Sequence, residues 1–374
     1  MITDAFSEYF SNITDPRQKA KISYLLFDVL FLTVCAIIAG ANGWEDIEDF
    51  GEAHFDWLQS KGLFKSGLPV HDTIARIISC LDPTQFQQCF IKWMAQVSAV
   101  SDGQLIAIDG KTLRGSYHRE DRQSTIHMVS AFATANGVVM GQLKTDDKSN
   151  EITAIPALLQ VLELKGCLVS IDAMGCQTEI AETIVNRGGD YLLAVKGNQK
   201  TLHETVSSAL KPHIKTAITC LENSHSRSEA RAYAVITADE LAKQFPKWPK
   251  LSSIGATMSY RRTKNGKESL EYRYYISSAS LTTTQFANAV RGHWGIENSL
   301  HWVLDASLSE DSCQIYRDNA AEVLAVVRHM AVNMLRSETT KKASIRRKQN
   351  IAAMKPNYLE KVLASGFTTE LDKN

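Results

Sequence analysis

Two apolar runs, each ending in a single aspartate, stand out in the hydrophobic pattern of the middle of the chain. Leu105–Ile108 leads into Asp109, and Cys167–Ile171, which is apolar apart from one serine, leads into Asp172. Runs of this length and composition predict short buried strands. Each aspartate would then lie at or near the carboxyl end of its strand and face a cleft. Two such carboxylates from neighbouring strands can converge on a divalent cation.

The segments around these two strands alternate between strand and helix patterns. Further strands are predicted at 125–135, 138–144 and 191–195, and helices at 150–164 and 178–186. Asn136-Gly137, between the first two of these strands, is a strong hairpin signal. The order strand, hairpin, helix, strand, helix, strand predicts an α/β fold with a mixed sheet and helical crossovers, as in the ribonuclease H-like fold.

A β-rich insertion is predicted at about 201–285. Its strands are expected at 230–236, 254–262 and 269–277, and Lys264–Lys267 predicts a hairpin turn between the last two. Five basic residues give the insertion a positive edge: Arg261, Arg262, Lys264, Lys267 and Arg273. This edge could hold DNA phosphates, or it could be the solvated side of an ordinary hairpin, and charge alone does not decide.

Residues 1–100 are predicted to form a small all-helical domain. Asp72 is expected to cap a helix at 73–81, and Asp82-Pro83 is expected to begin another. The domain is either a DNA-binding module or a structural cap on the domain that follows. It contains no sharp helix-turn-helix signature that would settle the choice.

The apolar run Ile22–Ala41 imitates a signal peptide or a membrane span. Asp28 lies inside it, where a carboxylate would cost about 2.5–3.5 kcal/mol in a bilayer, so a buried core helix and no membrane partner are expected. The seven cysteines are scattered and odd in number, and none has the close spacing of a zinc site. This pattern fits a reducing, cytoplasmic compartment.

Residues 286–336 return to a helical pattern, in which His293, Glu297, His301 and Asp305 recur every four residues. On a helix these four side chains would share one face. The adjacent stripe is apolar and consists of Ile296, Leu300 and Val303. It would pin the helix to the sheet and turn the polar face toward the two aspartate strands.

A second glutamate, Glu310, competes with Glu297 for the role of third acid. Its neighbours Ser307–Ser309 predict a loop, in which a carboxylate is poorly fixed. Metal catalysis needs ligands held to within roughly half an ångström, so Glu297 is the expected acid. Further on, Asn319 and Glu322 predict a capping box for the next helix.

The formal net charge is zero, with 41 basic and 41 acidic residues, so nothing global indicates a nucleic-acid partner. Local basic patches matter more than the sum. Residues 341–374 form a predicted basic tail that either contacts DNA phosphates or is a solvated helix end. Lys111, Arg114 and Lys196 come just after strands, where they could hold phosphates or be ordinary surface charges.

Two carboxylates at strand ends and one on a helix form a standard ligand set for Mg²⁺. A pair of such ions roughly 3.5–4 Å apart can activate an attacking oxygen and stabilise the leaving one, as phosphodiester chemistry requires. An alternative from another enzyme class is a zinc hydrolase whose site would use His293, Glu297 and His301.

Several longer stretches of the chain resemble the H-repeat-associated insertion-sequence transposases of bacteria, which are members of the DDE superfamily. The stretches are AIDGKTLRGS (107–116), KSNEI (148–152), SIDAMGCQ (170–177), LLAVKGNQ (192–199), HWGIENSLHWVLD (293–305) and ED…RDNAAE (310–322). Together with the helical region before them, they cover nearly the whole chain.

This resemblance implies a ribonuclease H-like catalytic domain over 101–340, with Asp109, Asp172 and Glu297 as the DDE triad. It implies two Mg²⁺ ions, with Mn²⁺ as a substitute, and cleavage at the inverted-repeat ends of the chain's own element followed by strand transfer into target DNA. It also implies a homodimer in the active complex, in a cytoplasmic, nucleoid-associated protein. A non-catalytic DNA-binding relic of a mobile element would share the same resemblance.

The chain departs from the family at one signature. The wider group places its third acid in a Tyr–Arg–Glu–Lys pattern, and here Val290, His293 and Leu304 stand in place of the tyrosine, arginine and lysine. The resemblance therefore suggests DNA contacts by other residues. The candidates are Lys111, Arg114, Lys196, Asn198, His293 and His301.

Overall fold

The computed structural model describes residues 2–98, 103–116, 125–145, 151–214, 218–224 and 227–368. Its centre is one nine-stranded sheet in the order β3-β2-β1-β4-β5-β9-β8-β7-β6. The strands are β1 (Leu105–Leu113), β2 (Ile126–Ala133), β3 (Val138–Thr145), β4 (Leu168–Ile171), β5 (Asp190–Val195), β6 (Ile218–Ser224), β7 (Arg227–Thr237), β8 (Ser253–Thr263) and β9 (Glu268–Ser277). Strands β1, β4 and β5 run parallel, and the other pairs are antiparallel. The predicted mixed α/β sheet is confirmed.

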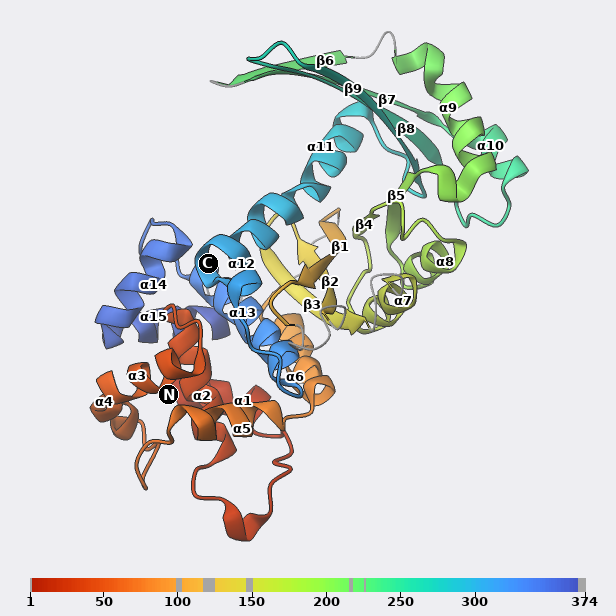
Figure 1. The fold of residues 1–374 in the computed structure, drawn as a ribbon. Coiled ribbons are helices and arrows are strands. Elements are labelled where there is room, and N and C mark those ends of the chain that lie inside the picture. The colour runs from red at the N-terminus through yellow and green to blue at the C-terminus, as the bar shows by residue number, and fades with distance from the viewer. Residues whose placement is uncertain are drawn as a thin grey trace.

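The insertion extends the sheet instead of folding apart from it. Strand β9 pairs antiparallel with β5, from Leu192 opposite Ser277 to Val195 opposite Tyr274. Strands β6 to β9 then form an arm that projects beyond the rest of the molecule (Figure 1). Both predicted hairpin turns are present, and each has a glycine with positive φ, Gly137 at 67° and Gly266 at 75°.

Fifteen α-helices surround the sheet within the described residues. Their bounds are α1 (Ile2–Phe10), α2 (Leu26–Ile38), α3 (Trp44–Ala53), α4 (Phe55–Ser60), α5 (His71–Ser79), α6 (Pro83–Val97), α7 (Glu151–Val161), α8 (Thr178–Asn186), α9 (Lys200–Ile214), α10 (Asp239–Gln244), α11 (Thr283–His293), α12 (Trp302–Leu308), α13 (Ala320–Ser337), α14 (Ile345–Met354) and α15 (Pro356–Phe367). Short 3₁₀ turns lie at Lys19–Lys21, Gly197–Gln199 and Glu310–Ser312, and a π-helix spans Ile296–His301.

Side-chain alternation along β1 sorts its residues between the two faces of the sheet. Ile106 and Ile108 pack with α7 and α8 on one face. Ala107 packs with the large helical body on the other face, and Leu105 packs with α11 there. Asp109 follows in the same alternation and therefore faces α11 and the helical body (Figure 1).

The N-terminal helices share one hydrophobic core with the C-terminal ones. Residues of α1 to α6 pack around α13, which is buried from Ala320 to Leu335, and against α15. Residues 2–98 are thus largely helical, as predicted, but their core is completed by the other end of the chain. The segment expected to be a basic tail is instead the folded helices α14 and α15, anchored by Leu359, Val362 and Leu363. Its last six residues, 369–374, lie outside the described part of the chain.

Helix α2 is the buried core helix expected from the Ile22–Ala41 run. Asp28 is buried in it, and its carboxylate accepts a hydrogen bond of 2.8 Å from the backbone N–H of Phe64. Burial raises the pKa of this carboxyl group despite that hydrogen bond. Across the residues that the structure describes, none of the helices is both long enough and apolar enough to cross a membrane.

Two of the three predicted helix caps are wrong. Asp82 does cap α6, because its carboxylate accepts from the N–H of Thr84 at 2.9 Å. Asp72 instead lies within the first turn of α5, which begins at His71. Asn319 precedes α13 but makes no cap, because its amide donates to the carbonyl of Leu81 at 2.8 Å and so links two parts of the core.

Lys348 of α14 is the cation of a buried cluster that ties the C-terminal helices to α13. Its ammonium donates to the carbonyl of Leu335 at 2.7 Å and lies 3.7 Å from the carboxylate of Glu338, whose side chain is fully buried. We expect Lys348→Met to lower the free energy of unfolding by about 3 kcal/mol, because it leaves a buried carboxylate without its cation. Urea denaturation measures the loss, and a change under about 1 kcal/mol would contradict the role of this cluster.

Candidate active site

Asp109 and Asp172 are brought together by the register of two parallel strands. Strand β1 pairs with β4 from Leu105 opposite Leu168 to Ile108 opposite Ile171. The next residue on each strand is an aspartate, so the two carboxylates leave the sheet side by side. Asp109 was predicted to lie at or near the end of its strand, but it lies in the middle, because β1 continues to Leu113 beside β2. It is β4 that stops, and this opens the sheet next to Asp109.

The turn after β4 fixes the backbone around Asp172. The Oδ1 atom of this residue accepts hydrogen bonds from the N–H groups of Met174 at 2.9 Å and Gly175 at 3.3 Å. A Cβ atom on Gly175 would lie 2.3 Å from a methyl group of Ile171, so only glycine fits here. Asn198, a candidate DNA contact, also holds this turn, because its amide donates to the carbonyl of Ala173 at 2.7 Å.

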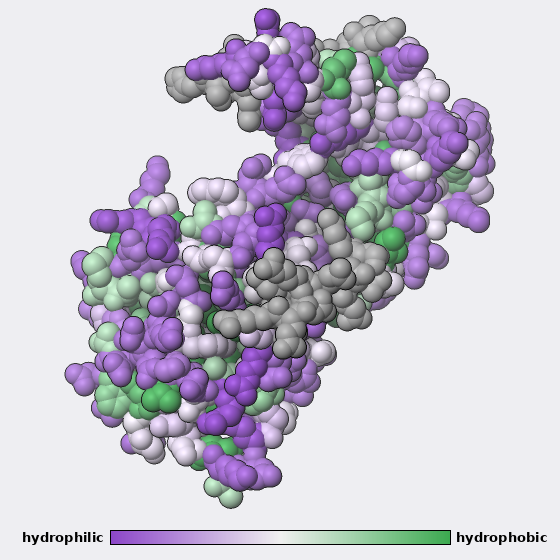
Figure 2. All heavy atoms as spheres, viewed as in Figure 1, coloured by the Kyte–Doolittle hydropathy of each residue, from purple (hydrophilic) through white to green (hydrophobic). Residues whose placement is uncertain are grey.

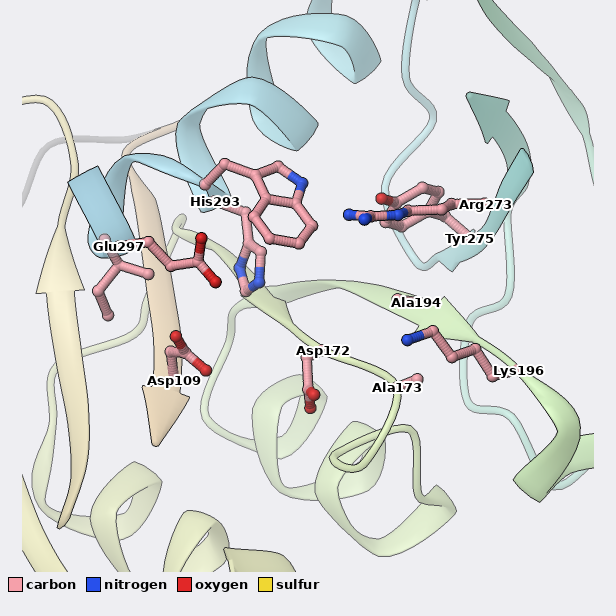
Figure 3. A pocket seen from close by; sticks show the side chains of 11 residues that line it. Asp109, Asp172, Ala173, Ala194, Lys196, Arg273, Tyr275, His293 and Glu297 are labelled. Atoms are coloured by element: carbon pink, nitrogen blue, oxygen red, sulfur yellow. The ribbon is translucent and has the colours of Figure 1, made fainter. Parts of the chain in front are cut away.

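Glu297 lies on the π-helix between α11 and α12. Ile296 and Leu300 are fully buried and anchor this helix to the core, while Glu297 is exposed toward the hollow (Figure 3). The predicted four-residue polar stripe is not formed as one face. A π-helix closes i→i+5 hydrogen bonds, so residues four apart no longer lie above one another. His293 ends α11 with its Nδ1 3.0 Å from Ser170 Oγ, whereas His301 lines a different, smaller cavity.

The two aspartates and Glu297 line one hollow of about 130 Å³ (Figure 3). The other lining residues are Ala173, Ala194, Lys196, Arg273, Tyr275, His293, Trp294 and Ile296. The acids occupy one side, and the cations Lys196 and Arg273 occupy the other (Figure 3). Separated charges of this kind can hold a divalent cation and a polyanion next to each other.

Burial and neighbouring negative charge act together on Asp109. Desolvation, followed by the carboxylates of Asp172, Glu297 and Glu151, raises the pKa of Asp109 to about 7, although the N–H of Gly110 partly offsets this. Glu151 lies on the opposite side of β1, beneath Gly110, where its Oε1 is 2.5 Å from His127 Nε2. Of the KSNEI stretch, only this glutamate and Ile152 belong to the described residues.

The two histidines next to the acids are neutral near pH 7. Burial lowers the pKa of His293 to about 4 against the pull of Asp172. Burial and the positive charge of Lys111 lower the pKa of His301 to about 4 as well. His301 Nδ1 lies 3.7 Å from an oxygen of Asp109. Neither imidazole therefore supplies a positive charge for a phosphate group.

Lys111, a candidate phosphate contact, does not line the hollow. Its ammonium lies 2.7–3.0 Å from the carboxylates of Asp305, Glu310 and Asp311. Arg114 is mostly exposed and lies 3.5 Å from Asp311. Among the predicted cations only Lys196 lines the hollow.

Glu310 is well fixed, contrary to the loop predicted for it. It begins a short 3₁₀ turn, its side chain is 1% exposed, and it lies 3.0 Å from Lys111. It nevertheless lines the smaller cavity and not the hollow that holds Asp109 and Asp172. Glu297 is the glutamate that shares a hollow with both aspartates.

Three residues of the hollow were missed from the sequence as site residues: Arg273, Tyr275 and Trp294. Arg273 had been placed only on the basic edge of the insertion. The guanidinium of Arg273 stacks 4.2 Å from the ring centre of Trp294 and binds both oxygens of Glu271. Arg273 and Tyr275 reach the hollow because β9 pairs with β5, and no local sequence pattern predicts this pairing. Trp302 is 64% exposed.

The zinc-hydrolase interpretation does not fit the geometry. His293 and Glu297 line the hollow, and His301 lines the smaller cavity. Over the described ranges of the chain, no group of three or more His, Cys, Asp or Glu side chains, the three acids of the hollow included, is arranged as it stands so that it could hold a metal ion. A tetrahedral zinc site would require such a group.

Comparisons with known proteins agree with this architecture. Residues 100–334 match the family model described as transposase DDE domain, and residues 7–94 match the model described as DDE_Tnp_1-associated. The chain belongs to the DDE transposase family. Its H-repeat relatives include the H repeat-associated putative transposase YhhI of Escherichia coli K12, 49% identical over 96% of this chain and 97% of that protein.

Other relatives are similar over comparable lengths. The putative transposase YncI of Escherichia coli O157:H7 is 46% identical over 100% of this chain and 99% of its own length. A cryo-EM structure of the piggyBac transposase synaptic complex with hairpin DNA matches 97% of this chain and 80% of that one, at 11% identity and a TM-score of 0.46. That likeness is too distant to carry over any residue.

The raised pKa of Asp109 makes a prediction about stability. The folded-state value of about 7 lies above the unfolded value of about 3.9, so the folded protein binds this proton more tightly. The free energy of unfolding therefore falls as the pH rises between these values. We expect Asp109→Asn, which lacks this loss, to stabilise the metal-free protein more at about pH 8 than at about pH 5. Thermal unfolding in EDTA measures this, and an equal difference at both pH values would contradict it.

Proposed function

We propose that this transposase cleaves DNA at the inverted-repeat ends of its own element and joins them to target DNA, with Asp109, Asp172 and Glu297 as the catalytic acids. The observation that carries the proposal is that these three acids share one hollow, at the point where β4 ends and the sheet opens. Among the residues that the structure describes, no fourth carboxylate lines that hollow.

The strand order supports a ribonuclease H-like catalytic domain. The first five strands lie in the order β3-β2-β1-β4-β5, with β1, β4 and β5 parallel and the β2–β3 hairpin antiparallel. Helices α7 and α8 make the crossovers between them. The insertion then extends from β5, and α11 returns the chain to the acids.

The donor set suits Mg²⁺, with Mn²⁺ as a substitute. All three candidate ligands are carboxylates, which hard divalent cations prefer, and their mutual repulsion contributes to the raised pKa of Asp109. When bound, a pair of such ions supplies Lewis acidity at the attacking and leaving oxygens. In Figure 3 the Asp172 carboxylate points away from Glu297 and Asp109, so this side chain would have to turn to share a cation with them.

DNA is the partner that the far side of the hollow suits. Lys196 and Arg273 stand across from the acids, and an indentation lined largely by hydrophilic residues separates the β-arm from the helical body (Figure 2). A phosphate backbone running through this indentation would pass the cations and reach the acids. Joining two ends in one event also implies a second copy of the chain in the active complex.

The first test of this proposal is nicking of DNA that carries the element's own inverted repeats. We expect Asp109→Asn, Asp172→Asn and Glu297→Gln each to slow nicking in Mg²⁺ at least about 10²-fold, because each removes a charge at the reacting phosphate. Glu182→Gln, an exposed acid on α8, is the matched control and should nick at the wild-type rate.

DNA binding in Ca²⁺ and thermal unfolding of the same variants show whether they remain intact. Normal nicking by any of the three site variants would remove that residue from the site. A wild-type protein that binds the inverted repeats but never nicks them in Mg²⁺ or Mn²⁺ would support the DNA-binding relic instead.

The second test uses the salt dependence of DNA binding. We expect affinity to fall steeply with salt, and Lys196→Ala and Arg273→Ala each to reduce the slope of log affinity against log salt by about 1. Lys243→Ala on α10 is the control, because this lysine is exposed and lies outside the hollow. A slope unchanged by both site variants would mean that DNA does not pass these cations.

A further inference from the structure

Lys111 is the centre of a buried ion cluster beside the candidate active site. Its ammonium lies 2.7 Å from Asp305, 2.9 Å from Asp311 and 3.0 Å from Glu310. Its side chain is only 10% exposed. Burial opposes the charged form of Lys111, but the three carboxylates outweigh it and raise the pKa of the ammonium group. Of the three acids around this lysine, Glu310 is buried at 1% exposure, whereas Asp305 and Asp311 are partly exposed, so removal of the lysine leaves the buried Glu310 without its cation.

This cluster joins β1, which carries Asp109, to the helical segment that carries Glu297. Lys111 follows Asp109 by two residues on β1, so both side chains face the same side of the sheet. Asp305 lies on α12, which continues directly from the π-helix that carries Glu297. His301 is the last residue of that π-helix, and its Nδ1 lies 3.7 Å from a carboxylate oxygen of Asp109.

The backbone is shaped to complete this contact. Ser309 adopts a left-handed conformation with φ of 53°, which is uncommon for a residue other than glycine, and it turns the chain so that Glu310 and Asp311 follow. At the end of β1, a Cβ atom on Gly115 would lie 2.0 Å from the carbonyl oxygen of Cys313. Strand β1 and the segment after α12 therefore meet with no space between them.

We propose that Lys111 is a positioning residue, whose ion cluster clamps β1 to α12 and so fixes Glu297 relative to Asp109. This inference rests on the proposed function of the three acids. A buried ion cluster is weak evidence for stability, because apolar residues can hold two elements together equally well. What three short ion pairs from two segments add is a defined orientation, in addition to the burial of Ile296 and Leu300 that anchors the π-helix.

The test compares Lys111→Met with Lys348→Met, which removes another buried lysine paired with a carboxylate, in the core of the helical body. Both variants lose a buried cation, so both lose stability. We expect Lys111→Met alone to slow nicking of saturating inverted-repeat DNA by about 10- to 100-fold and to weaken Mn²⁺ binding, measured by electron paramagnetic resonance, by a similar factor. DNA affinity in Ca²⁺ should stay within about twofold of the wild type, since Lys111 does not reach the hollow.

Gly115→Ala tests the same contact without changing any charge, and it carries the test if Lys111→Met does not fold. The added methyl group must push residues 311–313 away from β1, so nicking and Mn²⁺ affinity should fall in the same direction. Gly43→Ala is its control, because a Cβ atom there meets nothing within 4 Å.

Two outcomes would overturn the inference. Equal loss of nicking and of Mn²⁺ affinity in Lys111→Met and Lys348→Met would mean that the cluster serves only stability. Wild-type Mn²⁺ affinity in both Lys111→Met and Gly115→Ala would mean that the clamp does not place the acids. If the wild type binds Mn²⁺ but never nicks DNA, the proposed function fails, and the Mn²⁺ comparison still decides the role of Lys111.

Discussion

The short parallel pairing of β1 with β4 is the constraint on which the candidate site depends. It lasts four residues and ends at Ile108 and Ile171, one position before the two aspartates. Beyond that point β1 pairs only with β2, and β5 continues on the other side as far as Val195, where it pairs only with β9. The hollow is the space that β4 leaves between them. A longer β4 would fill this space with another strand, and the carboxylates would have no common opening.

The helical body matters to the site because α13 connects it to the sheet and to the π-helix. Asn333 of α13 accepts from the N–H of Val139 and donates to its carbonyl, both at 2.9 Å, and so satisfies the edge strand β3 much as another strand would. Arg336, one turn further on, donates to the carbonyl of Gly137 in the β2–β3 turn and to that of Ser299 in the π-helix. Carbonyl groups in an irregular helix need partners from elsewhere. One buried helix therefore supports both the sheet edge and the segment that carries Glu297.

Local signals predicted the parts of this molecule that local forces build. The aspartate-tipped runs, the Asn136-Gly137 hairpin and the Asp82 cap follow from hydrophobic pattern and turn chemistry within a few residues. The π-helix was missed because its buried positions, Ile296 and Leu300, also fit an α-helical stripe. The partners of Lys111 were missed because they lie about two hundred residues away, and an exposed lysine has the same local sequence signal as a buried one. Contacts between distant segments decide which charges line the hollow and which face each other.

The two sides of the hollow carry charges of opposite sign. On the side of the acids, burial and crowding raise the pKa of Asp109 to about 7, and the neighbouring His293 is kept neutral with a pKa of about 4. The acids on that side have no cation paired with them, because Lys111 forms its ion pairs with Asp305, Glu310 and Asp311. Near pH 7 Asp109 is only partly ionised, so binding of a divalent cation there would be linked to release of a proton. On the opposite side, Lys196 lines the hollow, and Arg273 lines it while it binds Glu271 and stacks on Trp294. Under the proposed function, divalent cations would neutralise the acids, and the phosphodiester would lie against the cations on the other side of the hollow.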